Sequence, residues 1–328
     1  MRLARVAAPL ALAAAMAVGV GACSTVAPTP LPGATPSATP SATVTAGGAP
    51  TAQPCTNAVQ SYAPDGALPA PGAIAATSTM GKIRARGRLI AGVSADTRLL
   101  GSRNPLLGRI EGFDIDLVQQ IADAILGPGA KVELRVITAA DRLPVLEKKE
   151  VDVVVRNMTI TCDRWKTIAF SAEYYRAGQK ILIRKGSTIT GLASLAGKQV
   201  CAPTGTSSLT NLVRLAPKAI PVPATTHTEC LVNLQQGKVE AITGDDTVLA
   251  GLASQDPYAV VLSEKAFTAE PYGVGIPADQ VDMVKFVNAV LENDRTSGDW
   301  TKSYDTWLAP ELGKGTGQPA PSYGRPTP

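Results

Sequence analysis

From residue 88 onward, apolar and polar positions follow two alternating patterns. Short apolar runs, which predict buried strands, occupy residues 88–93, 132–136 and 151–155. Between the first two runs, apolar residues at helical spacing share one face: Phe113, Leu117, Ile121 and Ile125. Gly127 ends that predicted helix, and a short helix is expected at 142–150. Alternation of strand and helix is typical of an α/β domain with a parallel sheet.

The same alternation repeats in the second half of the chain. A strand at 180–184 leaves the first unit, and Thr204-Gly205-Thr206-Ser207-Ser208 opens a helix between further strands. The later predicted elements are strands at 199–202, 239–243 and 272–276 and an amphipathic helix at 281–291. These positions predict two α/β domains, one of them interrupted by the other.

We expect the interrupted domain at 80–183 and 271–312, with the inserted domain at 184–270. Two neighbouring crossovers between the domains would form a hinge, and the cleft that the hinge closes is the expected binding site.

The first residues have the pattern of an export signal. Arg2 and Arg5 precede an apolar run that ends in Val20-Gly21-Ala22-Cys23. A basic start, a short apolar core and small residues before a cleavage site predict a secretory signal peptide, here 1–22. Val-Gly-Ala-Cys resembles the lipobox of bacterial lipoproteins, so Cys23 is the predicted lipidation site. The alternative is an ordinary secreted protein in which Cys23 has no such role.

Three further segments are predicted to lie outside the two domains. Residues 23–54 carry the lipid anchor and a Pro/Ala/Thr/Ser-rich linker without charge, which cannot bury enough apolar surface to order itself. Residues 55–79 form an N-terminal arm, and the Pro-rich residues 313–328 form a flexible C-terminal tail.

Composition narrows the classes of function. The net charge is only +4 and basic residues do not cluster, which argues against nucleic acid as a partner. The sequence holds one histidine, His227, so a His-rich metal site is excluded. We expect neither a metal nor a cofactor, and because no Ser/His/Asp set is evident, we do not expect an enzyme.

The five cysteines fit an oxidising compartment. With Cys23 acylated, four remain, and these allow three connectivities. The pairing we expect is Cys201–Cys230 and Cys55–Cys162; buried free thiols are the alternative.

Several segments match a known series, in order from Gly87 to Leu308. They are 112–117, 151–161, Arg164, 170–175, 195–200, 204–207 and 237–241. Together they resemble the family 3 extracellular solute-binding proteins, the polar amino-acid-binding proteins of bacterial ABC importers, closest to the glutamate-, aspartate- and glutamine-binding lipoproteins. The resemblance implies a periplasmic-binding-protein type II fold with a two-crossover hinge. It also implies an extracytoplasmic, lipid-anchored monomer that captures a free amino acid for a membrane permease.

The resemblance also implies how the ligand's carboxylate is held. Arg164 matches the arginine that takes the α-carboxylate in a bidentate manner, a geometry that suits guanidinium and not lysine. Thr159 matches a hydroxyl contact. Thr206 and Ser207 lie where a loop opens a helix, so their N–H groups and the helix dipole favour the same carboxylate.

The ligand's ammonium would be held from the other domain. Asp245 matches the family's acid for this group, whereas the neighbouring Asp246 is expected to cap the next helix. Asn157 matches the residue whose backbone faces the ligand. A zwitterion between Arg164 and Asp245 would therefore bridge the two domains and favour closure.

Two further arginines bear on specificity. Arg142, in the segment 138–144, matches an arginine that meets the side-chain carboxylate in glutamate/aspartate binders, and Arg103 lies in a second loop expected at the cleft. The prediction is therefore an acidic ligand, L-glutamate or L-aspartate. The alternatives are a glutamine/asparagine-binding protein, a sensor that reports to a membrane partner, and a dehydratase-like enzyme on the same fold.

Overall fold

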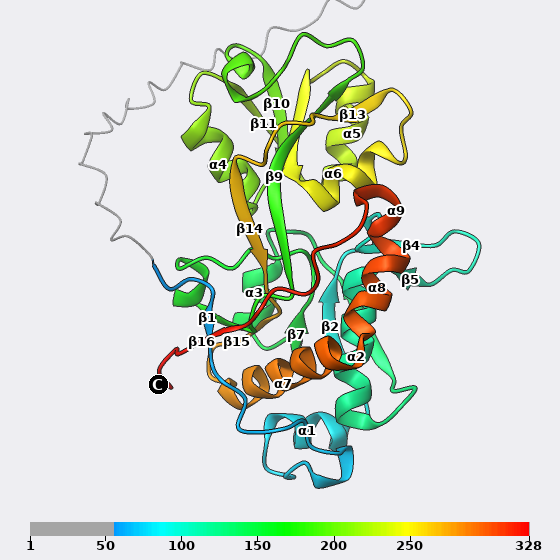
Figure 1. The fold of residues 1–328 in the computed structure, drawn as a ribbon, viewed down its shortest axis with the longest axis vertical. Helices are drawn as coiled ribbons and strands as arrows, with labels where there is room; N and C mark the ends of the chain where they lie inside the picture. The colour runs from blue at the N-terminus through cyan, green and yellow to red at the C-terminus, as the bar shows by residue number, and fades with distance from the viewer. Residues whose placement is uncertain (1–55, 328) are drawn as a thin grey trace, which may run out of the picture. The chain divides into compact units, whose positions relative to one another are not determined.

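The structure, a computed structural model, describes residues 56–327, which belong to one compact unit. Two sheets organise this part of the chain, and we call each sheet with its covering helices a lobe (Figure 1). Strands and helices alternate in both lobes, so the predicted α/β class is confirmed.

The first lobe is built on a five-stranded sheet in the order β6-β2-β7-β15-β8. Its strands are β2 (Leu89–Val93), β6 (Val132–Val136), β7 (Val153–Val154), β8 (Ile168–Phe170) and β15 (Gly275–Pro277). β2 pairs in parallel with β6 and β7, but β15 runs antiparallel to β7 and β8. The sheet is therefore mixed, not parallel as predicted, because the chain re-enters it from the other lobe.

The first lobe also contains six α-helices and two short 3-10 helices within the described residues. They are α1 (Thr79–Arg86), α2 (Phe113–Leu126), α3 (Arg142–Glu147), α7 (Val281–Ser297), α8 (Asp299–Trp307) and α9 (Ala309–Leu312), with the short 3-10 helices η1 (Pro71–Ala73) and η2 (Arg164–Lys166). The face predicted for α2 is buried in the core. α3 ends earlier than expected, and Lys149 soon after it adopts a left-handed φ of 55°.

The second lobe contains a six-stranded sheet in the order β11-β10-β12-β9-β13, with β14 also paired to β9. Its strands are β9 (Tyr175–Arg184), β10 (Gln199–Pro203), β11 (Ile220–Ala224), β12 (Ala241–Asp245), β13 (Ala259–Val261) and β14 (Thr268–Tyr272). The helices of this lobe are η3 (Leu192–Leu195), α4 (Ser207–Leu215), α5 (His227–Gln235) and α6 (Asp246–Ala253).

Two antiparallel strands connect the lobes. β9 leaves the first lobe and β14 returns to it (Figure 1). The two strands pair with Tyr175 opposite Tyr272 and Gln179 opposite Thr268. This pair forms the two-crossover hinge. The predicted return strand 272–276 is in fact divided between β14 and β15. The domain bounds expected from the sequence, 80–183 with 271–312 and 184–270, stay a prediction.

A three-stranded sheet lies beside the first lobe and touches the second. It consists of β3 (Asp96–Thr97), β4 (Gly101–Arg103) and β5 (Ile110–Glu111). Thr228 Oγ1 of α5 donates to the Asp96 carbonyl at 3.0 Å, and Arg98 Nε donates to Ser254 Oγ at 3.0 Å. The lobes are thus joined by contacts at this rim as well as at the hinge.

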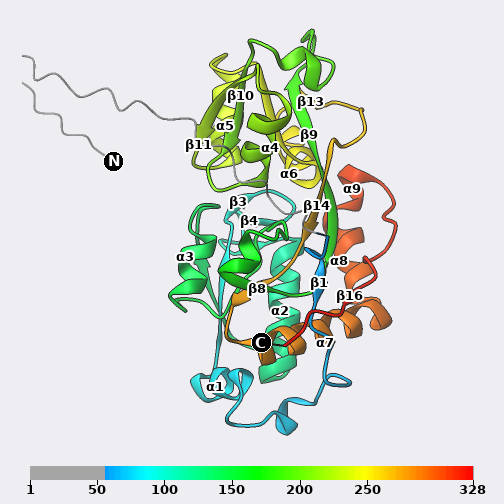
Figure 2. The ribbon, with the colours of Figure 1, turned by 90° about the vertical axis from the view of Figure 1, so that its left-hand side faces the viewer.

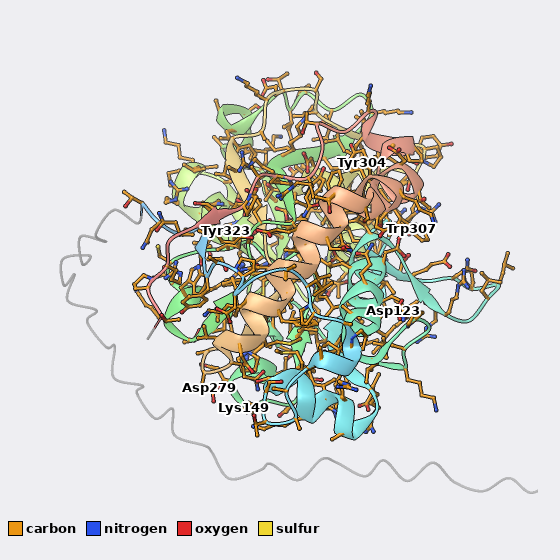
Figure 3. All side chains as sticks on the ribbon, turned by 60° about the horizontal axis from the view of Figure 1, so that its bottom comes forward. Asp123, Lys149, Asp279, Tyr304, Trp307 and Tyr323 are labelled. Carbon is orange, nitrogen blue, oxygen red and sulfur yellow. A yellow bond between two sulfur atoms is a disulfide. The ribbon has the colours of Figure 1, made fainter. Side chains whose placement is uncertain are left out.

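The two ends of the described chain lie side by side. β1 (Gln60–Ser61) pairs in parallel with β16 (Ser322–Tyr323), as Figure 2 shows from the side. Tyr323 also donates its hydroxyl hydrogen to Glu292 of α7 at 2.7 Å (Figure 3). The expectation of a flexible tail at 313–328 therefore differs from the structure, in which residues 313–327 are fastened to the arm and to α7.

The cysteines follow the prediction where they are described. Cys201 and Cys230 form a disulfide with their Cα atoms 5.5 Å apart, joining β10 to α5 inside the second lobe. Cys162 is also disulfide-bonded, but its predicted partner Cys55 lies outside the described residues. So do Cys23, the signal peptide and the linker.

Within residues 56–327, no helix is both long and apolar enough to cross a membrane.

Candidate functional site

The residues predicted from both lobes meet beside the hinge. Thr159 follows β7 in the first lobe and Ser207 begins α4 in the second, and their hydroxyl oxygens lie 3.0 Å apart. A cavity of about 500 Å³ opens here, with Arg164, Gly205 and Thr206 among its lining residues. The structure therefore brings Thr159, Arg164, Thr206 and Ser207 together in one cleft.

The start of α4 is built to present N–H groups to this cleft. Thr206 caps the helix: its Oγ1 accepts the Leu209 N–H at 3.2 Å and donates to the Pro203 carbonyl at 2.6 Å. Because this hydroxyl is engaged in the cap, Thr206 can contribute to anion binding only through the helix end that it stabilises. The first N–H groups of a helix lack intrahelical partners, and the helix dipole makes this end attractive to a carboxylate.

Arg164 reaches across from the first lobe. Its Nη1 donates to the Thr159 carbonyl at 2.5 Å and its Nη2 to the Gly205 carbonyl at 3.1 Å. Burial lowers the pKa of this guanidinium, whereas the nearby Glu270 and Asp245 raise it. Main-chain oxygens of both lobes thus hold the Arg164 guanidinium at the N-terminal end of α4.

Asp245 supplies a buried acid at the end of β12. The Tyr272 hydroxyl donates to its Oδ2 at 2.7 Å, whereas its Oδ1 is buried without a hydrogen-bond partner among the described residues. Burial, reinforced by Glu270, raises the pKa of Asp245 to about 8. An ammonium group that donated to Oδ1 would favour the ionised form.

Asn157 turns the backbone between β7 and the cleft. It adopts φ 37°, its N–H donates to Asp114 Oδ2 at 2.8 Å, and its Oδ1 is buried without a partner among the described residues. Its carbonyl accepts a hydrogen bond from Arg142.

Glu270 is a site residue that the sequence analysis missed. Its carboxylate, on hinge strand β14, is 1% exposed. Oε2 accepts from Thr159 Oγ1 at 2.7 Å and from Ser207 Oγ at 2.6 Å, while Oε1 accepts from Asn211 Nδ2 at 3.0 Å. Glu270 therefore ties both lobes to the hinge. The available signal was an acid two residues before the strand predicted at 272–276.

Arg142 has a different role from the one predicted. It is 3% exposed, and four of its five N–H donors bond to main-chain carbonyls: those of Ala139, Arg156, Asn157 and, in the second lobe, Gly205 at 2.9 Å. Burial, then the charges of Arg164 and Arg156, lower the pKa of this guanidinium. Arg142 is committed to holding the backbone, which leaves little of it for a ligand carboxylate.

Arg103 is not brought to the cleft. It lies exposed on β4, and its Nη1 donates to the Gly108 carbonyl at 2.7 Å. β4 and β5 form a short hairpin, and the arginine bridges the turn of that hairpin instead of reaching a ligand. The structure gives Arg103 no contact with the described cleft residues, and its role in binding stays a prediction.

The chain is similar to known proteins in sequence and fold. The family model of the bacterial extracellular solute-binding proteins, family 3, matches residues 89–310. The chain belongs to this family. The match covers both lobes and the hinge, and it includes every candidate site residue named above.

Individual family members are similar over most of the folded chain. The ABC transporter glutamine-binding protein GlnH of Bacillus subtilis is 36% identical over 231 residues, 70% of this chain and 84% of the relative. The glutamine-binding protein of Geobacillus stearothermophilus is 40% identical over 202 residues, 61% of this chain and 77% of the relative.

Among solved structures, the ancestral amino acid-binding protein AncCDT-1, a precursor of cyclohexadienyl dehydratase, has a TM-score of 0.65 and 31% identity. The match covers 70% of this chain and all of that chain. The type II periplasmic-binding-protein fold expected from the sequence is confirmed.

Proposed function

We propose that this family 3 solute-binding protein captures a free L-amino acid between its lobes and delivers it to the membrane permease of an ABC importer. Arg164 and the start of α4 would hold the α-carboxylate, and Asp245 would hold the α-ammonium. The observation that carries the proposal is a cation and an acid from different lobes: Arg164 lines the cleft, and the buried Asp245 lies close enough to raise the pKa of Arg164 and has one oxygen without a partner among the described residues.

Contacts with the ligand would supply the free energy that stabilises the closed form. Each charged group of a zwitterion leaves water when the lobes close, and it needs a partner in the site. Arg164 comes from the first lobe and Asp245 from the second, so a bound amino acid makes contacts in the closed form that are absent from the open form. A permease that reads the closed form would then distinguish loaded from empty protein.

For the side chain, we propose a carboxamide ligand, L-glutamine, ahead of the acidic ligand expected from the sequence. The prediction of an acidic ligand depended on Arg142, but this side chain donates four hydrogen bonds to main-chain carbonyls. Two relatives with 36% and 40% identity are named as glutamine-binding proteins.

L-Glutamate or L-aspartate is the second candidate, and Arg156 favours it. Arg156 is 5% exposed, and among the described residues its side chain makes one hydrogen bond, from Nε to the Ile137 carbonyl at 2.9 Å. Its Nη atoms are therefore open to a carboxylate oxygen. Burial lowers the pKa of Arg156, and the nearby charges of Asp96, Asp114 and Asp141 only partly offset this effect.

The location and the partner belong to the same proposal. Acylation of Cys23 would tether the protein outside the cytoplasm, with the linker separating the lobes from the membrane. Binding would occur without turnover. A membrane sensor in place of a permease would read the same closed form.

Isothermal titration tests this function. The chain is produced from residue 23 with Cys23→Ser, stripped of ligand by unfolding and refolding, and titrated with L-glutamine, L-asparagine, L-glutamate, L-aspartate and L-arginine. We expect micromolar binding or tighter, about −8 kcal/mol, for L-glutamine. Absence of heat with all five would remove the proposal, and tighter binding of L-glutamate would select the second candidate.

Arg164→Ala tests the carboxylate site in the same titration. Loss of a bidentate charged pair in a desolvated cleft should weaken every α-amino acid by at least about a hundredfold, or roughly 3 kcal/mol. Lys166→Ala on the same short helix is the matched control, because Lys166 is exposed and pairs only locally with Asp163.

A further inference from the structure

The family match leaves out both ends of the described chain. It spans 89–310, whereas residues 56–88, which include the arm, and the terminal segment at 311–327 lie outside it. These two segments are nevertheless joined, because β1 pairs with β16 through Gln60 opposite Ser322 and Ser61 opposite Tyr323. In Figure 1 the terminal segment runs from α9 down to β16, where it meets the arm.

Both segments converge on one side chain, Trp165. The Arg325 guanidinium carbon lies 3.6 Å from the centroid of the indole, a cation–π contact. The indole Nε1 donates to the Ala58 carbonyl at 2.7 Å. Tyr62 and Phe170 pack edge-on against the same ring, with centroids 6.1 Å and 5.6 Å away.

Arg325 is itself held in place by the arm. Its Nε donates to the Gln60 carbonyl at 2.8 Å, its Nη2 to the Asn57 carbonyl at 3.0 Å, and its own N–H to the Ser61 carbonyl at 3.2 Å. One guanidinium therefore fixes the terminal segment to the arm while covering the indole. We call Arg325, Trp165 and residues 57–62 the terminal clamp.

The clamp lies directly behind the proposed ligand site. Trp165 is the residue after Arg164, and both belong to η2, which has only three residues. Helices this short have few internal hydrogen bonds and depend on their surroundings for a fixed position. Here one side of η2 presents Arg164 to the Thr159 and Gly205 carbonyls, and the Trp165 side is held by the clamp.

We propose that Arg325 is a positioning residue for ligand binding: by holding Trp165 against the arm, it keeps Arg164 directed into the cleft. This inference rests on the proposed role of Arg164 as the contact for the α-carboxylate. A bidentate pair tolerates little misorientation, so freeing η2 reduces affinity even where the overall fold persists.

The arm gives the clamp its rigidity. Ser61 Oγ donates to the Phe170 carbonyl at 2.8 Å, and Asn288 Nδ2 of α7 donates to Ser61 Oγ at 2.9 Å and to the Tyr62 carbonyl at 2.7 Å. These bonds are buried. Loss of Arg325 would leave the arm seated in the first lobe and would free the indole face, which makes Arg325 a suitable place to disturb the clamp alone.

Titration of the chain from residue 23 (Cys23→Ser) with L-glutamine and L-glutamate tests the inference. Arg325→Ala and deletion of residues 325–328 should each raise the Kd of the tighter ligand about five- to tenfold. Arg325→Lys keeps a cation for the indole but loses the planar contact and the two-point bonding to the arm, so an intermediate Kd is expected. Lys314→Ala is the matched control on the same segment, since among the described residues its side chain takes part in no hydrogen bond or ion pair.

A double-mutant cycle separates positioning from general stability. If Arg325 acts through Arg164, then Arg325→Ala should change the Kd less than twofold in an Arg164→Lys background. Thermal unfolding of each variant accompanies the titrations, because a purely structural residue would lower the Tm and leave the Kd unchanged.

Three outcomes have distinct meanings. An unchanged Kd in both Arg325→Ala and the deletion would overturn the inference, as would an equal loss in the two backgrounds. If Arg164→Ala itself leaves the affinity for every amino acid intact, the proposed carboxylate site is wrong as well. If Arg164→Ala abolishes binding and the Arg325 variants do not, only the terminal clamp fails.

Discussion

The buried carboxylate of Asp245 should make the ligand-free protein less stable as the pH rises. Its pKa is raised from 3.8 to about 8, chiefly by burial and then by Glu270. Between these two values the folded state holds a proton that the unfolded state has released, so unfolding releases a proton and stability falls with increasing pH. Asp245→Asn replaces this carboxylate with a neutral group that can still accept the Tyr272 hydroxyl.

The size of the effect follows from linkage. The difference of about four pKa units corresponds to roughly 5–6 kcal/mol once the pH exceeds 8, and to roughly 3 kcal/mol at pH 6. At pH 4 the difference should almost vanish, at about 0.5 kcal/mol. Asp245→Asn should therefore stabilise the ligand-free chain by an amount that grows by roughly 1.4 kcal/mol per pH unit between the two pKa values. These free energies are upper values, because opening of the cleft would hydrate the carboxylate and reduce the shift of its pKa. The same substitution should abolish ligand binding, since the partner of the ammonium is lost.

Urea unfolding of the two chains between pH 4 and 9 measures the difference directly. Asp279→Asn is the control, because Asp279 is an exposed partner of Lys149 (Figure 3) and its pKa is lowered, not raised. Parallel stability profiles for Asp245→Asn and the unmodified chain would refute the reasoning, because they would mean that Asp245 does not carry a raised pKa in the folded protein.

Three other substitutions have defined outcomes. Arg142→Ala should weaken L-glutamine and L-glutamate by similar factors in titration, since this arginine fastens main chain of both lobes; a loss confined to acidic ligands would show instead that it contacts their side chain. Gly205→Ala should weaken all ligands, because Gly205 has φ +73° and a Cβ there would lie 2.7 Å from Ala140 Cα in the other lobe, and small-angle scattering with saturating ligand should still show the open form. Replacing Cys201 and Cys230 with Ala should cost about 2–4 kcal/mol in urea unfolding with little change in Kd, because the bridge lies within one lobe; a large change in Kd would contradict this.

Sequence pattern was sufficient where a residue's role is decided locally. Leu117, Ile121 and Ile125 recur at helical spacing and are fully buried or nearly so on α2. Thr206 precedes an apolar helical segment and caps α4 as expected of such a residue. Ser207 could be placed where a loop opens a predicted helix, whereas the assignment of Thr159 to the cleft depended on the resemblance to the family.

Roles that depend on distant main chain could not be predicted in this way. Arg142 carries a charge that suits a carboxylate, but its guanidinium is taken by carbonyls whose positions only the folded backbone defines. Glu270 is recognisable from the sequence only as an acid just before a predicted strand, and its partners Thr159 and Ser207 are 111 and 63 residues away. The terminal segment has no apolar periodicity, and Arg325 is held by main chain some 265 residues earlier.

The charges in the cleft also indicate why closure would depend on ligand. When the lobes meet, Arg142 and Arg164 converge on the Gly205 carbonyl, and each arginine opposes the other's charge. On the anionic side, burial and then the charge of Glu270 raise the pKa of Asp245. Each like-charged pair lies within one lobe, and closing the cleft without ligand removes the water that screens its charges, which favours the open form. A zwitterionic amino acid reverses both repulsions, because its carboxylate faces the arginines and its ammonium faces Asp245. The charges that destabilise the empty closed form therefore stabilise the closed form that holds ligand.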